Sequence, residues 1–185
     1  MPSAPRPASL RDELRHRRPF RSPAQEAAVA VLRTADVVRR RLAAAVEPAG
    51  VTLPQYNVLR ILRGAHPEPL ATSAIAERLI EQTPGVTRLL DRLEAQGWVA
   101  RARCLDDRRL VHCRVTAEGL ALLARLDPAV DAADDAALGA LGPRDLAALT
   151  ALLARVRQDS DRERPDQDRL SDAPAGVHPV ASGPP

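Results

Sequence analysis

Hydrophobic residues between about positions 72 and 116 follow first a helical and then an extended period, with tight turns between the segments. This order predicts a helix, a turn, a second helix and a β-hairpin. The two strands are predicted at residues 98–103 and 110–115, on either side of a polar turn at residues 106–107. The apolar stripe of the second helix is expected to comprise Val86, Leu89, Leu90 and Leu93. Such a succession is that of a winged helix-turn-helix, which lays its second helix in a DNA groove.

The second helix of this pair carries sequence signals at both ends. Thr83 is suited to cap the free amide groups at its start, and Pro84 fits the first helical turn. Gly97 can take the left-handed conformation that ends a helix. The positions outside the apolar stripe carry short polar groups and guanidinium groups suited to base edges and phosphates. They are Thr87, Arg88, Asp91 and Arg92.

Further helices are predicted on both sides of this segment. Their expected starts are Ser22, Thr52, Thr116 and the pair Gly142-Pro143, and the first two precede a Gln at capping-box spacing. Pro128 is expected to kink or restart the helix after the hairpin, because proline removes a backbone donor. The residues expected to face the interior are Ala28, Leu32, Ala35, Leu42, Val46, Leu59, Leu62, Ile75, Leu79, Ile80, Leu120, Leu123 and Leu126.

The predicted fold class is mainly α with a small β-hairpin wing, a winged helix-turn-helix flanked by N- and C-terminal dimerisation helices. The winged helix takes residues 51–116, and the dimerisation helices take residues 22–47 and 117–158 of a single domain, 22–158. The apolar faces of the outer helices exceed what one winged helix can cover, so we expect them to pair across a two-fold axis. The alternative is an intramolecular bundle in a monomer.

The two ends of the chain are predicted to be disordered tails. Residues 1–21 are rich in Arg and Pro, and residues 159–185 in Asp, Arg, Pro, Gly and Ser. Neither end can bury enough apolar surface to offset the entropy of ordering. A DNA-touching arm is the alternative interpretation of residues 1–21.

Charge and hydropathy restrict the class of protein. All 27 basic residues are Arg, and the net charge of +3 permits a polyanionic partner without establishing one. The hairpin concentrates positive charge, with five Arg against Asp106 and Asp107. No apolar run approaches the roughly 18 residues of a membrane span, and no leader follows the N-terminus, so a cytoplasmic location is expected.

The sequence offers no catalytic or metal-binding constellation. It has no glycine-rich phosphate loop and no nucleophile beside one of its 4 His, so we expect no enzyme activity and no cofactor. Cys104, Cys113 and His112 fit no zinc spacing, so no metal site is predicted. The two Cys are either small, half-buried strand residues or a redox switch activated by nearby Arg. The aromatic content of 2% disfavours single-stranded nucleic acid as a partner.

With these residues in view, the chain resembles the MarR family of bacterial transcription regulators over residues 28–157. The resemblance rests on GVTLPQYNVLRIL, on TPGVTRLLDRLEAQGWVARARCLDDRRLVHCRVTAEGLALL and on the helical flanks. It implies a homodimer that binds pseudo-palindromic double-stranded DNA, usually as a repressor. In many members a small molecule bound between the dimerisation helices and the winged domain releases the DNA.

The resemblance assigns roles to particular residues. Thr87 and Arg88 are expected in the major groove, with Arg88 as the candidate for a bidentate guanine contact. Ser73 and Thr83, at helix N-termini, are expected to meet phosphates. Asp107 is expected to hold the wing in shape by pairing with Arg92 or Arg109. The full set of predicted DNA-binding residues is Ser73, Thr83, Gly85, Thr87, Arg88, Arg92, Arg108 and Arg109. Arg108 or Arg109 is expected to reach the minor groove from the wing, with a merely solvated turn as the alternative.

Alternatives remain at several positions. Thr87 can simply face solvent, and Arg92 can simply pair with Asp91, Glu94 or Glu81. Tyr56 is expected to pack, with contact to an effector as the alternative. The first helix has no Cys, which argues against the peroxide-sensing mechanism of some family members. The alternative function is a winged-helix module for protein–protein contact, although such a module is expected to lose the cations of the second helix and the wing.

Overall fold

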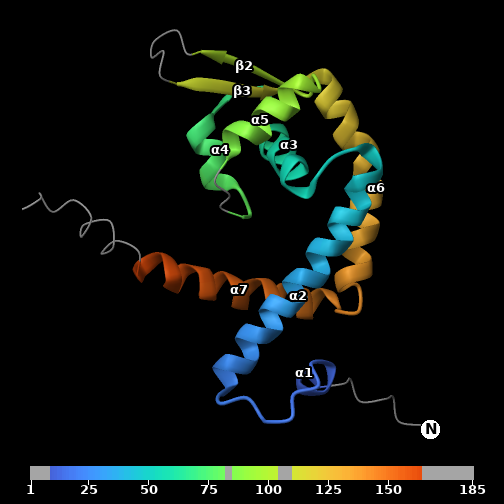
Figure 1. Cartoon of the computed structure of the whole chain (residues 1–185), viewed down its shortest axis with the longest axis vertical. Helices are drawn as coiled ribbons and strands as arrows, with labels where there is room; N and C mark the ends of the chain where they lie inside the picture. Colours follow the sequence, from blue (N-terminus) through green and yellow to red (C-terminus); the bar gives the residue numbers. More distant parts are fainter. Residues whose placement is uncertain (1–8, 82–84, 104–109, 164–185) are drawn as a thin grey trace, which may run out of the picture. The chain divides into compact units, whose positions relative to one another are not determined.

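The computed structural model describes residues 9–81, 85–103 and 110–163, with side chains up to residue 158. It divides into two units, Met1–Gly139 and Ala140–Pro185 (Figure 1). The first unit holds, in chain order, α1 (Leu10–Glu13), α2 (Pro23–Val46), the 3-10 helix η1 (Glu47–Ala49), α3 (Leu53–Ala65), β1 (Leu70–Ala71), α4 (Thr72–Arg78), α5 (Val86–Ala95), β2 (Val99–Arg103), β3 (Val111–Val115) and α6 (Ala117–Leu138). The described part of the second unit contains α7 (Pro143–Glu163). The predicted mainly α fold with a β-hairpin wing is confirmed.

The wing is a small antiparallel sheet in the order β1-β3-β2. In the β2–β3 hairpin, Val99 lies opposite Val115 and Arg101 lies opposite Cys113. Strand β1 adds Leu70 on the other side of Cys113. The sequence analysis did not predict β1, because two residues are too few to show a strand period.

Side-chain caps set the predicted helix starts. The Thr52 hydroxyl accepts from the Gln55 amide at the start of α3, and the Gln55 side chain accepts from the Thr52 amide at 2.9 Å, which is the predicted capping box. Ser22 caps α2 by accepting from the Gln25 amide at 3.1 Å. The Gln25 side chain accepts from the amide of Arg21 rather than Ser22, so this second box is shifted by one residue.

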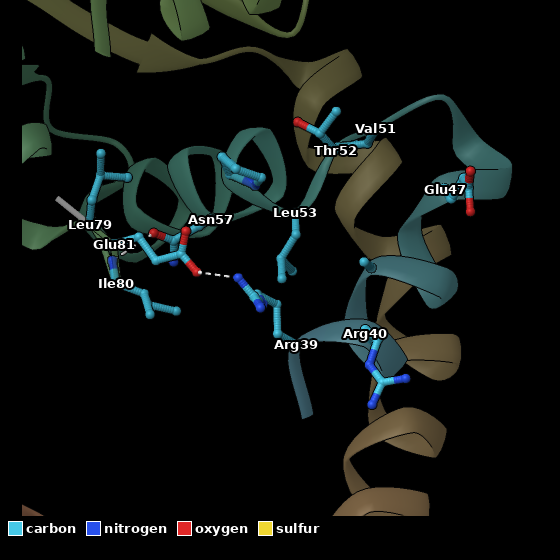
Figure 2. A pocket seen from close by; sticks show the side chains of 12 residues that line it. Arg39, Arg40, Glu47, Val51, Thr52, Leu53, Asn57, Leu79, Ile80 and Glu81 are labelled. Atoms are coloured by element: carbon cyan, nitrogen blue, oxygen red, sulfur yellow. Dashed lines mark hydrogen bonds and ion pairs between the residues drawn. The ribbon is translucent and has the colours of Figure 1, made fainter. Parts of the chain in front are cut away.

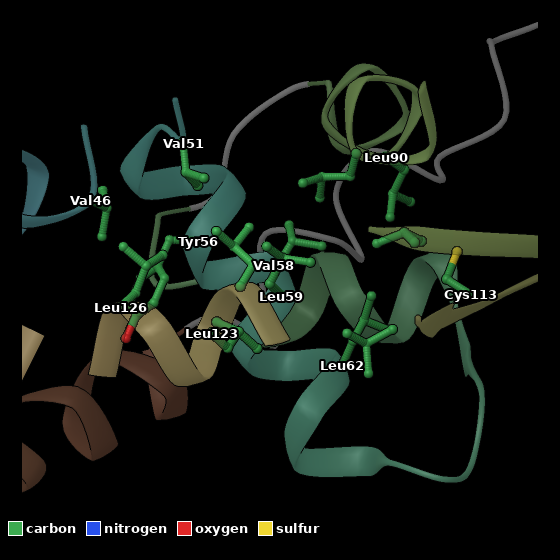
Figure 3. Packing of buried hydrophobic residues seen from close by; sticks show 14 of the residues in the cluster. Val46, Val51, Tyr56, Val58, Leu59, Leu62, Leu90, Cys113, Leu123 and Leu126 are labelled. Carbon is green, nitrogen blue, oxygen red and sulfur yellow. The ribbon is translucent and has the colours of Figure 1, made fainter. Parts of the chain in front are cut away.

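A single hydrophobic core centres on α3 and joins the wing to α6 (Figure 3). Helix α5 contributes Leu90 and Leu93, each 0% exposed, so its predicted apolar stripe is confirmed. The other buried apolar residues are Val46, Val51, Tyr56, Val58, Leu59, Leu62, Ile75, Val99, Cys113, Val115, Leu122, Leu123, Leu126 and Val130. At roughly 25 cal/mol per Å² of apolar surface removed from water, this cluster is the main source of stability of the first unit.

Some residues predicted to be interior are exposed in the single chain. On α2, Leu32 is 71% exposed, and Ala28 and Ala35 are exposed too. They share a helical face as predicted, but no described residue of the first unit buries it. Ile80 was also expected in the core and is 79% exposed. Helix α4 ends at Arg78 and the next residue is extended, so Ile80 leaves the helical face.

Helix α6 continues through Pro128, so of the two predicted outcomes, a kink or a restart, the restart is wrong. The carbonyl that proline leaves unbonded belongs to Ala124, which is exposed as Pro128 is, so water can satisfy it. Helix α5 begins at Val86 with Gly85 as its N-cap and no side-chain cap, so the predicted start at Thr83 is wrong. Gly85 has φ of 120°, a conformation that other residues rarely adopt.

Helix α7 of the second unit begins at Pro143, as predicted. On one face of α7, Leu146, Leu149 and Leu153 are half-buried and Val156 is 65% exposed. Among residues 9–81, 85–103 and 110–163, no single helix is long and apolar enough to cross a membrane, and only α6 and α7 counted together reach that length and hydropathy. The predicted disordered tails, residues 1–21 and 159–185, overlap the described residues at both ends. Helix α1 (Leu10–Glu13) lies within the first and α7 runs to Glu163 in the second, so the predicted boundaries of the tails are wrong. The rest of the prediction falls on residues 1–8 and 164–185, outside the described residues.

Candidate nucleic-acid interface

Helix α5 presents two polar rows on the side opposite its buried stripe. One row contains Thr87, Asp91 and Glu94, which recur at spacings of four and three residues. The neighbouring row contains Arg88 and Arg92, both exposed. A rigid helix therefore carries two guanidinium groups on its solvent side, in the form that major-groove readout requires.

The two exposed guanidinium groups, those of Arg88 and Arg92, form no ion pair among the residues that the structure describes. The alternative in which Arg92 pairs with Asp91, Glu94 or Glu81 is therefore wrong. Both side chains remain available for an external anion.

The acidic row of α5 is held by Arg101 of β2. The Arg101 Nη2 atom lies 2.8 Å from the Asp91 Oδ1 atom, and the Arg101 Nε atom donates to the Glu94 Oε2 atom at 2.8 Å. The hydrogen bonds from Arg101 lower the pKa of the Glu94 carboxyl below its ordinary value. Sequence reasoning counted Arg101 only as part of the basic hairpin. The signal it missed was an Arg two positions after the buried Val99, on the covered face of a strand.

Ser73 and Thr87, both predicted to bind DNA, lie at one place in the structure. They line one hollow of about 290 Å³ between α4, α5 and the wing. Arg101 and Val111 contribute to its walls from the two strands. Thr87 is exposed at this hollow, so the alternative in which it faces solvent stays open. Ser73 therefore lies on the side of α5 that carries the row of Thr87, Asp91 and Glu94.

Several predicted site residues cannot be placed. Thr83, Asp107, Arg108 and Arg109 lie outside the described residues, so their DNA-binding and wing-structuring roles stay predictions. Gly85 is exposed at the N-cap of α5, where its conformation sets the entry of the chain into the helix.

The described cysteine does not resemble a reactive thiol. Cys113 is 0% exposed, and burial raises the pKa of its thiol. The thiolate is therefore disfavoured, and the interpretation of Cys113 as a buried structural residue is the better one. Its possible partner in a redox switch, Cys104, lies outside the described residues. No group of three metal-ligating side chains occurs in the described ranges.

A pocket of about 510 Å³ lies between α2, α3 and the end of α4 (Figure 2). Its walls are chiefly apolar, and its residues are Arg39, Arg40, Ala43, Glu47, Val51, Thr52, Leu53, Pro54, Asn57, Leu79, Ile80 and Glu81. This volume is within the roughly 300–1,000 Å³ of small-molecule sites. Because α2 and the chain leading to α5 form opposite sides, an occupant would touch both.

Two polar contacts cross this pocket. The Asn57 side chain accepts from the Ile80 amide at 3.2 Å, and the Arg39 Nη1 atom lies 3.8 Å from the Glu81 Oε1 atom. In Figure 2 the Arg39 and Glu81 side chains point toward one another across the opening. Tyr56 does not line the pocket; it is 4% exposed, which confirms the prediction that it packs.

Comparison with known proteins identifies this architecture. The MarR family model matches residues 51–111. The HTH-type transcriptional repressor Rv2887 of Mycobacterium tuberculosis is 36% identical over 110 residues, which are 59% of this chain and 77% of that protein. A MarR transcription factor from Planctomyces limnophilus is 37% identical, with a TM-score of 0.58 over 74% of this chain and 98% of that one. Sco3205 of Streptomyces coelicolor, a MarR family regulator solved in complex with DNA, shares the fold at 22% identity, with a TM-score of 0.68 over 80% of this chain and 97% of that one.

These findings define a winged helix-turn-helix regulator of transcription rather than an enzyme. The chain belongs to the MarR family.

Proposed function

We propose that the chain is a homodimeric repressor that binds a pseudo-palindromic site on double-stranded DNA through α5 and the wing. The observation that carries this proposal is the exposed row of Arg88 and Arg92, without an ion-pair partner among the described residues, on a helix anchored by Leu90 and Leu93. A winged-helix module adapted to protein contact has no need of such a row. The name of the mycobacterial relative supports repression as the sense of regulation. Because its proposed target is DNA, we expect the protein to act in the cytoplasm.

The experiment that tests DNA recognition is selection of bound fragments from a genomic library of the source organism, without added ligand. Recovery of one inverted-repeat sequence supports the proposal. Recovery of unrelated sequences, with equal affinity for any duplex at low salt, would overturn it in favour of the protein-contact module.

The proposal of a dimer rests on apolar surface left open in both units. Leu32 of α2 is 71% exposed and Leu152 of α7 is 56% exposed. Side chains of this kind on long helices are typical of surfaces that a second subunit covers. Sedimentation at micromolar concentration should give the mass of two chains for the wild type and of one chain for Leu32→Glu. A monomeric wild type would refute the dimer and the expected half-site spacing of roughly 34–36 Å.

The proposal of an effector rests on the pocket between α2, α3 and α4. Its walls suit a small molecule that is mainly apolar and has a polar end for Arg39 or Arg40. An occupant that displaces Leu79 or Ile80 shifts the segment leading to α5, and so lowers the affinity for DNA.

A gel-shift screen of small molecules against the recovered DNA tests this effector site. Replacing Leu53, a half-buried wall residue, with Trp should fill the pocket and abolish the response while the affinity for DNA persists. Release of DNA from Leu53→Trp at the wild-type ligand concentration would exclude this pocket.

A further inference from the structure

Arg101 occupies a place in β2 where the strand pattern favours an apolar residue. Val99, two residues earlier on the same face of the strand, is buried, and Cys113 opposite Arg101 is also buried. The intervening Ala100 and the following Ala102 are exposed. The Arg101 side chain is 23% exposed, so its stem lies against the core while its guanidinium reaches α5.

The guanidinium of Arg101 ends on two carboxylates of α5 at once. Asp91 and Glu94 are three residues apart and therefore project from the same side of the helix. The Arg101 Nη2 atom lies 2.8 Å from the Asp91 Oδ1 atom, and the Nε atom donates to the Glu94 Oε2 atom at 2.8 Å. A planar fork with several donors fixes direction as well as distance, which a lysine ammonium does not.

We propose that Arg101 is a positioning residue for DNA recognition. By holding Asp91 and Glu94 against the base of the wing, Arg101 sets the rotation of α5 about its own axis. In that orientation the row of Arg88 and Arg92 faces the duplex. Arg101 also neutralises two carboxylates that otherwise repel the phosphates those arginines must approach. The proposal rests on the proposed DNA-binding function of α5 and adds a residue that touches the helix and not the bases.

The competing interpretation is that Arg101 contacts a DNA phosphate directly. The two interpretations differ in what happens when the acids are removed and Arg101 stays. A direct contact is unaffected or strengthened by the variant Asp91→Asn/Glu94→Gln, because Arg101 is then free to reach phosphate. If Arg101 instead positions α5, the same variant loses sequence specificity, because Arg101 no longer has carboxylates through which to hold the helix.

The experiment measures dissociation constants for two duplexes, the sequence that the wild type selects from a random pool and a scrambled sequence of equal length and composition. The readout is the ratio of the two constants. In Asp91→Asn/Glu94→Gln we expect the ratio to fall by about tenfold, roughly the loss of one base contact. The scrambled duplex should bind more tightly, because two negative charges are gone. Arg101→Met should lower the ratio by a similar factor.

Two further variants complete the test. Arg103→Met removes an exposed Arg of the same strand and is the matched control, which should weaken both duplexes alike and keep the ratio. The charge exchange Arg101→Glu/Glu94→Arg rebuilds the ion pair with reversed sign, and should restore the ratio to within about threefold of the wild type. Thermal unfolding monitored by circular dichroism verifies that each variant is folded. Should the exchange variant not fold, the amide variant and Arg101→Met decide.

An unchanged ratio in Asp91→Asn/Glu94→Gln, with tighter binding to both duplexes, would overturn the proposal and identify Arg101 as a phosphate contact. A folded exchange variant no better than Arg101→Glu alone would overturn it as well. A wild type that prefers no duplex would instead remove the DNA-binding function on which the inference rests.

Discussion

Replacement of Arg88 by Ala tests the proposed readout most directly. Arg88 is exposed on α5 and, among the described residues, has no ion-pair partner that its removal would leave unpaired. Helix propensity also changes little, because both Arg and Ala favour helices. The free energy of unfolding should therefore remain nearly unchanged, and the whole effect should fall on DNA binding.

The expected magnitude follows from the contact that Arg88 is proposed to make. A bidentate Arg–guanine pair discriminates by about 1–3 kcal/mol. A dimer makes this contact once in each half-site, so additive losses amount to about 2–6 kcal/mol. At 1.4 kcal/mol for each factor of ten, the dissociation constant should rise by at least about 25-fold.

The assay is fluorescence anisotropy on the selected duplex at one fixed salt concentration, followed by a new selection with the variant. The new selection should show relaxed preference at one base position in each half-site. Arg125→Ala, which removes an exposed Arg from α6, is the control and should bind as the wild type does. An unaltered base preference in Arg88→Ala, or an equal loss of affinity on scrambled DNA, would refute the assignment of Arg88 to base readout.

Two further predictions concern the scaffold that supports α5. Gly119→Ala should destabilise the first unit by about 1–3 kcal/mol, because its new Cβ atom would collide with the backbone carbonyl of Trp98; an unchanged urea midpoint would show that α6 shifts freely. The second prediction concerns pH. Arg101 lowers the pKa of Glu94 in the folded chain, so the ion pair stabilises the fold at pH values above the ordinary carboxyl pKa. This stabilisation disappears as the pH falls through the lowered pKa. Urea titrations of wild type and Glu94→Gln should therefore differ at neutral pH and converge in acid, and a difference that grows in acid would contradict the assignment.

Periodicity and capping signals were sufficient to predict the order of the longer helices and the hairpin, and much of the core. Local spacing, which the sequence displays directly, determines three of these features. They are the capping box at Thr52, the left-handed conformation of Gly97 and the apolar stripe of α5 that ends at Leu93. Periodicity also correctly grouped Leu32 with its neighbours on one helical face. It does not say what covers a face, so the exposure of Leu32 within the single chain was not predictable from spacing alone.

The parts that failed depend on the tertiary structure. Ile80 continues the apolar spacing of α4 in the sequence, but the helix ends at Arg78 and the spacing loses its meaning there. The partners of Arg101 come from a different element, and a charge count of the hairpin cannot distinguish a guanidinium bound by carboxylates from an available one. Arg88 and Arg92 were predicted correctly as exposed cations because one helix determines their direction.

The junction at Thr116 has a mechanical consequence. The Thr116 amide and hydroxyl donate to the carbonyls of Trp98 and Gly97 at 3.0 and 2.7 Å, and Gly119 leaves no side chain between α6 and this corner. These contacts fix helix α6 to the start of the hairpin, so the two should move together as one rigid body. Any bending of the first unit that alters the reach of its arginines must then be absorbed elsewhere in the unit.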